Sequence, residues 1–154
     1  MFSAVASGLR NYLIEKLGDQ VKMVTYGTPE MIPVACQPCI LLATDAAQHI
    51  PAGCTQIPII LTVKLYAMTT QLSDNYSAVC AAQDLWWHYT DDSDHEGIMP
   101  ALIETAGGVM FTDRAGLDWM LHSVGDTTFR GLEQGKNYTG LITMDIKLVT
   151  YIKR

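Results

Sequence analysis

The spacing of apolar residues predicts that the chain begins with an amphipathic helix. Apolar side chains recur every four residues between residues 5 and 17, which places them on one helical face. The repeat consists of Val5, Leu9, Leu13 and Leu17. Ser3 is a suitable N-cap, and glycine is typical just beyond a helix end, where Gly18 stands. We therefore expect a helix that ends at about residue 17.

Two segments with strict alternation predict the main strands. Residues 57–68 have one wholly apolar face, formed by Ile59, Leu61, Val63, Leu65 and Ala67, and a second face that is mostly apolar. Residues 141–152 have one apolar face, and their other face includes Thr143, Asp145 and Lys147. We expect residues 57–68 to lie mid-sheet, with helices on one side and partial cover on the other. Shorter strands are expected at 21–26 and 39–43, and a polar loop at 45–56.

A second helix is expected to begin at Ser73 or Asp74 and to run to about His88 or Tyr89. More than half of its circumference is apolar, which is wider than the stripe that packs on one sheet. Adjacent residues on a helix point about 100° apart, so Trp86 and Trp87 cannot both join one core layer. Tyr76, Trp86 and Trp87 are therefore candidate contacts with another subunit. The alternative is a second layer contributed by the same chain.

The remaining elements complete an α+β pattern. A short helix from Pro100, closed by Gly107 and Gly108, should precede a hairpin of residues 109–112 with 117–124. The order of helices and strands has no βαβ repeat. It predicts one domain over residues 1–154, an α+β sandwich of a mixed or antiparallel sheet with helices packed on one side.

The composition indicates self-association. Charged residues make up 17% of the 154 residues, against about 25% in an average soluble domain, while 49% are hydrophobic. Subunit interfaces are depleted of charge and enriched in aromatic residues and Met, so we expect an oligomer. The alternative is that apolar residues are scattered over the surface. The apolar runs are shorter than the roughly 20 residues of a membrane span, and the start lacks the pattern of a secretory signal. We therefore expect a cytosolic protein with reduced cysteines, bound to no membrane.

Charge is unevenly distributed along the chain. Between Lys64 and Arg114 there are eight acidic residues and no Lys or Arg, so with a net charge of −6 the remainder carries +2. From Arg130 to the end there are five basic residues and two acidic ones. Such polarity permits head-to-tail stacking of copies, although a solvated acidic loop is an equal alternative. The negative net charge argues against binding nucleic acid through its phosphates.

Two groups of residues suggest metal chemistry. Three thiolates and an imidazole suit tetrahedral zinc, and the candidate set is Cys36, Cys39, His49 and Cys54. Buried, inert thiols are the more common explanation of such cysteines. Oxygen ligands for a divalent cation are offered by Asp91, Asp92, Asp94 and Glu96, but the spacing of a calcium loop is missing and a solvated acidic loop is favoured. A further hypothesis is a catalytic cysteine whose thiol is activated by a histidine acting as the base. We expect no cofactor.

The order of elements resembles a known family. An N-terminal helix, the segment IPIILTVKLYAM, the segment SDNYSAVCAAQDLWWH, a hairpin and the closing segment LITMDIKLVTYIKR are similar to those of the tail terminator proteins of long-tailed bacteriophages. They resemble more loosely the tail-completion and neck proteins of these phages. The likeness spans most of the chain and lies in length, architecture and strand–helix–strand order. The cysteine-rich segment 36–54 departs from it.

This resemblance implies a structural and non-catalytic role in the virion. Tail terminators are α+β sandwiches that form hexameric rings, cap the tail tube, stop its polymerisation and meet the head connector. The implied partners are further copies of the chain, the tail tube protein and the connector, with DNA only passing through the lumen. The implied location is the head–tail junction, and the host cytoplasm during assembly. Lumen or inter-ring contacts are expected at Asp91, Asp92, Asp94, Glu96, Thr143, Asp145 and Lys147. Alternative hypotheses are a head-completion or tail-tube subunit, and a zinc or thiol enzyme built on the cysteine set.

Overall fold

The computed structural model describes residues 2–31, 34–49, 55–89, 94–105 and 108–153. Its helices are α1 (Phe2–Leu17), α2 (Asn75–Trp86) and α3 (Ile98–Ile103). Its strands are β1 (Met23–Tyr26), β2 (Cys39–His49), β3 (Gln56–Leu72), β4 (His88–Tyr89), β5 (His95–Glu96), β6 (Val109–Thr112), β7 (Asp118–Val124), β8 (Thr128–Gln134) and β9 (Asn137–Lys153). Single 3-10 turns lie at Gly18–Gln20, Pro29–Met31 and Val34–Cys36.

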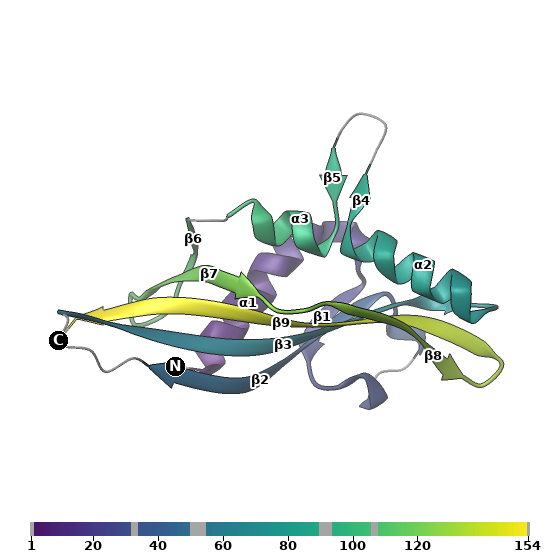
Figure 1. Ribbon diagram of the computed structural model, residues 1–154, viewed down its shortest axis with the longest axis horizontal. Coiled ribbons are helices and arrows are strands. Elements are labelled where there is room, and N and C mark those ends of the chain that lie inside the picture. The colour runs from purple at the N-terminus through teal and green to yellow at the C-terminus, as the bar shows by residue number, and fades with distance from the viewer. Residues whose placement is uncertain (1, 32–33, 50–54, 90–93, 106–107, 154) are drawn as a thin grey trace.

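The long strands β3 and β9 form the centre of a mixed sheet (Figure 1). They pair antiparallel from Gln56 opposite Lys153 to Leu72 opposite Tyr138, with one irregularity between Met68 and Gln71. On the far side of β3 lies β2, antiparallel to it, and then β1, parallel to β2. On the far side of β9 lie β8, along the first half of the strand, and β7 followed by β6, along the second half. The central place expected for residues 57–68 is confirmed.

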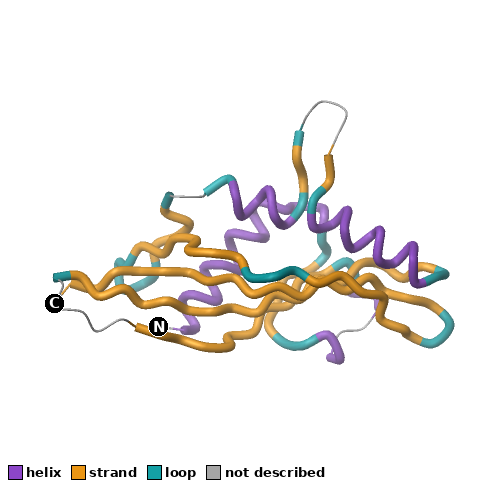
Figure 2. The backbone as a smooth tube through the Cα atoms, in the orientation of Figure 1, coloured by secondary structure: helices purple, strands orange, loops and turns teal. Residues whose placement is uncertain are grey.

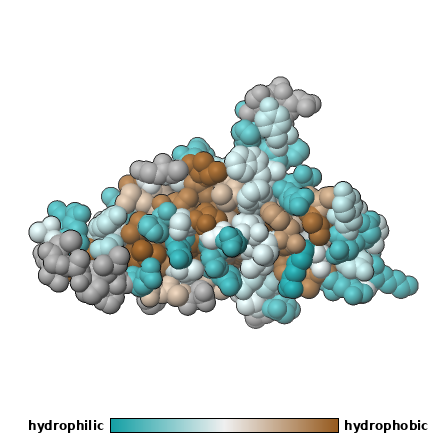
Figure 3. All heavy atoms as spheres, viewed as in Figure 1, coloured by the Kyte–Doolittle hydropathy of each residue, from teal (hydrophilic) through white to brown (hydrophobic). Residues whose placement is uncertain are grey.

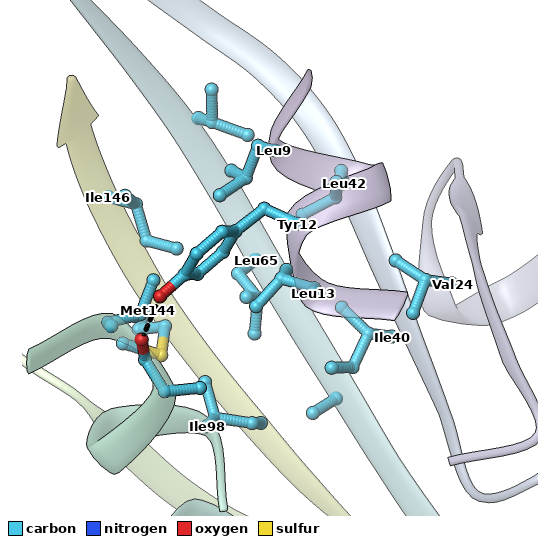
Figure 4. Close-up of a cluster of buried hydrophobic side chains, with 14 of the residues drawn as sticks. Leu9, Tyr12, Leu13, Val24, Ile40, Leu42, Leu65, Ile98, Met144 and Ile146 are labelled. Carbon is cyan, nitrogen blue, oxygen red and sulfur yellow. Dashed lines mark hydrogen bonds between the residues drawn. The ribbon is translucent and has the colours of Figure 1, made fainter. Parts of the chain in front are cut away.

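The α-helices of the described residues, α1, α2 and α3, pack on one face of this sheet (Figure 2). Helix α1 contributes Val5, Leu9, Leu13 and Leu17, and the sheet contributes Ile40, Leu42, Leu65, Met144 and Ile146 to the same buried cluster (Figure 4). Burying a leucine of this kind stabilises the fold by roughly 1.5–3 kcal/mol. The Tyr12 hydroxyl of α1 donates to the Ala101 carbonyl oxygen of α3, which ties the two helices together over the sheet. Helices on one side of a mixed sheet are therefore confirmed.

The other face of the sheet, termed here the outer face, is buried most completely at one end. There Cys39, Leu41, Met68 and Leu141 form a smaller buried cluster. The Gln37 side chain is 1% exposed and lies against Thr139 of β9, whose Oγ1 is 3.3 Å from Gln37 Oε1. Thr139 Oγ1 also donates to Gln134 Oε1 of β8 at 2.7 Å. These polar contacts hold Gln37 against the sheet. In the middle of the outer face, Thr62, Lys64, Tyr66, Thr143, Asp145 and Lys147 are half-buried.

Several predicted boundaries are wrong. The loop expected at 45–56 is strand at residues 45–49, because β2 continues along β3 to His49 opposite Ile59; residues 50–54 lie outside the described residues. The second helix ends at Trp86, because the Trp87 backbone is already extended (φ −154°, ψ 112°). Strand β8 has no counterpart among the predicted elements. The first helix and the hairpin of residues 109–112 with 117–124 are confirmed, and the short helix begins at Ile98, two residues earlier than expected.

Candidate functional site

A two-stranded ribbon projects from the helix layer of the molecule (Figure 1). It consists of β4 and β5, in which His88 pairs with Glu96 and Tyr89 with His95. Residues 90–93, which connect the two strands, lie outside the described residues. The ribbon leaves the body at the end of α2 and returns at Gly97, where α3 begins. At Gly97 the backbone has φ 118°, and a side chain would meet the Leu85 carbonyl oxygen at 2.7 Å. Only glycine suits this return.

Aromatic residues order the base of the ribbon. The Trp87 indole Nε1 donates to His95 Nδ1 at 2.7 Å, and the two rings meet edge to face with centroids 5.4 Å apart. Tyr89 adds a third ring, whose centroid is 5.1 Å from that of His95. Although the rings contact one another, Tyr89 is 59% exposed and Trp87 is 36% exposed. The ribbon therefore presents a pre-arranged aromatic surface to solvent, as protein-binding sites commonly do.

A groove of about 520 Å³ lies between the ribbon base, α3 and the end of α1. Trp87, His95 and Ile103 are among its lining residues, and Ile103 is 43% exposed. In the space-filling view, hydrophobic residues gather on the surface over α3, beside the base of the ribbon (Figure 3). Lys16 and Glu104 form an ion pair of 3.3 Å at the groove wall. The hydrogen bond from Lys16 to Glu104 and the negative charge of Glu104 raise the pKa of Lys16 above its usual value.

The predicted interface residues fall in three different environments. Trp86 points into the fold, where its ring meets Phe129 edge to face at 5.4 Å and packs against the main core. Trp87 lies at the base of the ribbon, between α2 and β4. Tyr76, on the first turn of α2, is 78% exposed. Trp87 and Tyr76 are therefore available to a partner, whereas Trp86 is mainly a core residue.

The described acidic residues of the ribbon are exposed: Glu96 lies in β5 and Asp94 directly precedes that strand. Asp91 and Asp92 lie outside the described residues. Within the described part of the chain, no group of three or more His, Cys, Asp or Glu side chains is arranged to hold a metal ion. The described part of the ribbon thus combines aromatic rings with negative charge.

Thr143, Asp145 and Lys147 lie together on the half-buried outer face of the sheet. Asp145 is opposite Lys64 in the β3–β9 register, and the Lys64 Nζ to Asp145 Oδ1 distance is 3.6 Å. Lys147 is opposite Thr62 and Thr143 is opposite Tyr66. This surface is on the side of the sheet away from the helices, and it is distinct from the ribbon.

The candidate zinc residues are not brought together. Cys39 and His49 are the first and last residues of β2, and at about 3.3 Å per residue the strand holds their backbones roughly 33 Å apart. One ion cannot bind both. Burial raises the pKa of the Cys39 thiol to about 11, and the neighbouring Cys36 adds to this rise. Cys54 lies outside the described residues.

Some residues of the ribbon site were not identified from the sequence. Tyr89 was expected only as a helix end. His95 was considered as a cation ligand in the acidic loop or as the base beside a cysteine nucleophile, and not as a partner of Trp87; Ile103 was not singled out. Their shared feature is a short stretch, residues 86–103, that is rich in aromatic and apolar residues around an acidic centre. Such a stretch between two helices was the available signal for a projecting ribbon.

No protein-family model matches the chain, and no curated protein matches it significantly in a sequence search. Within the described residues, no helix has the length and hydrophobicity required to cross a membrane.

Proposed function

We propose that this protein is a structural subunit of a bacteriophage tail. Its copies assemble into a closed ring, of six subunits as in tail terminators, which caps the tail tube, stops its polymerisation and joins it to the head connector. The protein acts through binding surfaces and not through catalysis. It works in the virion at the head–tail junction, after assembly in the host cytoplasm.

The ordered but exposed aromatic ribbon carries this proposal. Trp87 and Tyr89 are held by ring contacts to His95 and still present much of their surface to solvent. Pre-ordered aromatic residues lose little conformational entropy on binding, which makes them efficient interface anchors. The low charge content of 17% agrees with a molecule whose neighbours cover part of its surface.

The uncovered part of the outer face suits a lumen or a contact between rings. Among its polar residues, Thr143 is neutral while Asp145 and Lys147 carry opposite charges, and Lys64 lies close to Asp145. Such a surface has no strong attraction for DNA phosphates, and the net charge of −6 adds a general repulsion. DNA would therefore pass without binding tightly.

Native mass spectrometry and electron microscopy of the purified full-length protein test the ring. We expect a closed oligomer with a central opening, and a shift towards monomer in the Trp87→Ala variant. Tyr138→Ala, which changes a half-buried aromatic residue of β9 away from the ribbon, is the control and should leave the oligomer intact. A wild-type protein that stays monomeric at micromolar concentration would contradict the proposal.

Addition of the protein to polymerising tail tubes tests the terminator role. We expect tubes that stop growing once capped, so that their mean length falls as the protein concentration rises. A protein that forms tubes by itself would instead be a tube subunit. One that binds the connector but leaves tube growth unchanged would be a head-completion protein.

A further inference from the structure

The charged residues of the ribbon have a counterpart elsewhere on the surface of the same chain. The described charged residues of the ribbon, Asp94 and Glu96, are both acidic. A smaller hollow of about 250 Å³ lies between α1 and β1. Its two charged lining residues, Arg10 and Lys22, are both basic. We name this site the α1–β1 hollow.

The α1–β1 hollow is lined by apolar side chains as well as by these two cations. Val21 and Val24 are buried, while Ile14 is 42% exposed. Arg10 Nε donates to the Val24 carbonyl oxygen at 2.8 Å, which fixes the guanidinium at the wall of the hollow. A hollow that combines apolar side chains with two positive groups is complementary to an aromatic side chain beside a carboxylate.

Charge selects this hollow over the other described hollows. The groove at the ribbon base contains Lys16, Glu96 and Glu104 and is therefore net negative. The hollow between α1 and β6 contains Asp113 and Arg114, and the hollow beside β7 and the end of β9 contains Asp118 and Lys153. In each of these two hollows, one acidic and one basic residue give no net charge. Among the four, only the α1–β1 hollow is lined by charges of a single, positive sign.

We propose that the ribbon of one copy docks in the α1–β1 hollow of the next copy. The exposed rings of Trp87 and Tyr89 cover Ile14, and Glu96 faces Lys22. The ribbon projects away from the helix layer of its own chain, which leaves it accessible to a neighbour (Figure 1). This inference rests on the proposed ring and names the two surfaces that build it.

Docking of two unlike surfaces has a structural consequence. Each copy offers one ribbon and one hollow, so the contact is heterologous and adds copies head to tail. Such a contact closes into a ring when its rotation divides a full turn, and otherwise extends as a filament. It also predicts that a variant altered in the ribbon and a variant with the matching change in the hollow can assemble only if the two kinds of chain alternate.

Charge reversal in the full-length chain tests the pairing. We expect Glu96→Lys and Lys22→Glu each to weaken association by about tenfold or more, because each places like charges opposite one another. Glu133→Lys and Lys136→Glu make the same changes at exposed positions of the β8–β9 hairpin and should associate as the wild type does. Thermal unfolding of each variant checks that it is folded.

Mixing the two single variants gives the decisive readout. In the mixture, the lysine introduced at position 96 of one variant can face the glutamate introduced at position 22 of the other, while the remaining contacts keep the original Glu96 and Lys22. We expect native mass spectrometry to show restored oligomers with an even number of subunits and equal amounts of both chains. Single variants that associate as the wild type does, or a mixture that stays dissociated, would overturn this docking while leaving the ring itself possible. A monomeric wild type would overturn both.

Discussion

Gly140 of β9 lies so close to Ala78 of α2 that a methyl group at position 140 would overlap the Ala78 carbonyl oxygen. The same methyl group would lie 3.0 Å from Ala82 Cβ. The Gly140 amide donates to Thr69 Oγ1 at 2.8 Å, which ties β9 to β3 at the irregularity in their pairing. Helix α2 therefore rests on the backbone of β9 itself. This close approach sets the distance between α2 and the sheet, and hence the position at which the ribbon begins.

Gly140→Ala should destabilise the fold by about 1–3 kcal/mol or more, because the obstructing atom is backbone and cannot rotate away. Chemical denaturation followed by circular dichroism measures the change. Gly108→Ala is the control, since its new methyl group would meet only the Thr105 carbonyl oxygen, at an ordinary 3.5 Å. Equal stability of the two variants would show that α2 can lift from the sheet without cost.

The adjacent residues Trp86 and Trp87 should respond to substitution in opposite ways. Trp86→Ala removes a ring that packs on Phe129 and the core, and we expect a loss of about 2 kcal/mol, below the 3–5 kcal/mol of a fully buried tryptophan. Trp87→Ala removes a partly exposed ring whose hydrogen bond and ring contact with His95 order the ribbon. It should lower the free energy of unfolding less than Trp86→Ala does, while weakening self-association. Denaturation and native mass spectrometry of both variants check this. A Trp87→Ala protein as destabilised as Trp86→Ala would place both rings in the core.

Asp113 should make the stability of the β6–β7 hairpin depend on pH. Burial on its own raises the pKa of Asp113 and is the largest single influence, but hydrogen bonds from Trp119 Nε1 and from the amides of Leu117 and Ala115 together outweigh it. The folded pKa is therefore below the unfolded value of about 3.9. The charged carboxylate stabilises the fold above that pH, and its contribution is lost as the pH falls through the lowered folded pKa.

Asp113→Asn tests this expectation. An amide cannot accept from Ala115, Leu117 and the fully buried Trp119 at the same time, so we expect a loss of roughly 1 kcal/mol at pH 7. The difference from the wild type should shrink as the pH falls from 7 to 3, because the unfolded wild-type carboxyl then takes up a proton more readily than the folded one. Asp118→Asn is the control, because its amide oxygen can still accept from Thr112 Oγ1. A difference that is the same at both pH values would contradict the prediction.

The sequence predicts the elements whose stability is local or strongly periodic. The four-residue repeat of α1 and the alternation of β3 and β9 were sufficient to predict these elements. Strand β8 was missed because its sequence, TFRGLEQ, has no apolar alternation; it is a strand because β9 extends to Asn137 and pairs with it. Gly131 in β8 is likewise explained by a residue far away in the sequence, because a side chain at position 131 would collide with Asn75 of α2.

The candidate site was predicted in composition but not in geometry. The polar stripe of α2 continues at helical spacing through His88 and Asp91, so the sequence does not show that the chain turns extended at Trp87. The ring contact and hydrogen bond between Trp87 and His95 depend on that turn. Likewise, the CxxC pair followed by a histidine suggested a metal site because these residues are close in the sequence. The sequence spacing does not show that Cys39 and His49 stand at opposite ends of an 11-residue strand.

The thiol of Cys39 should be the slowest of the described cysteines to react with an alkylating reagent. It is fully buried, and with a pKa of about 11 only about one thousandth of it is thiolate at pH 8. Cys36 and Cys80 are half-buried. Treatment of the folded protein with iodoacetamide at pH 8, followed by peptide mass analysis, should show label on Cys36 and Cys80 well before Cys39. All three should react at similar rates in denaturant. Early labelling of Cys39 in the folded protein would mean that β2 separates readily from residues 34–38, and that the Gln37, Gln134 and Thr139 contacts do not hold that end of the outer face closed.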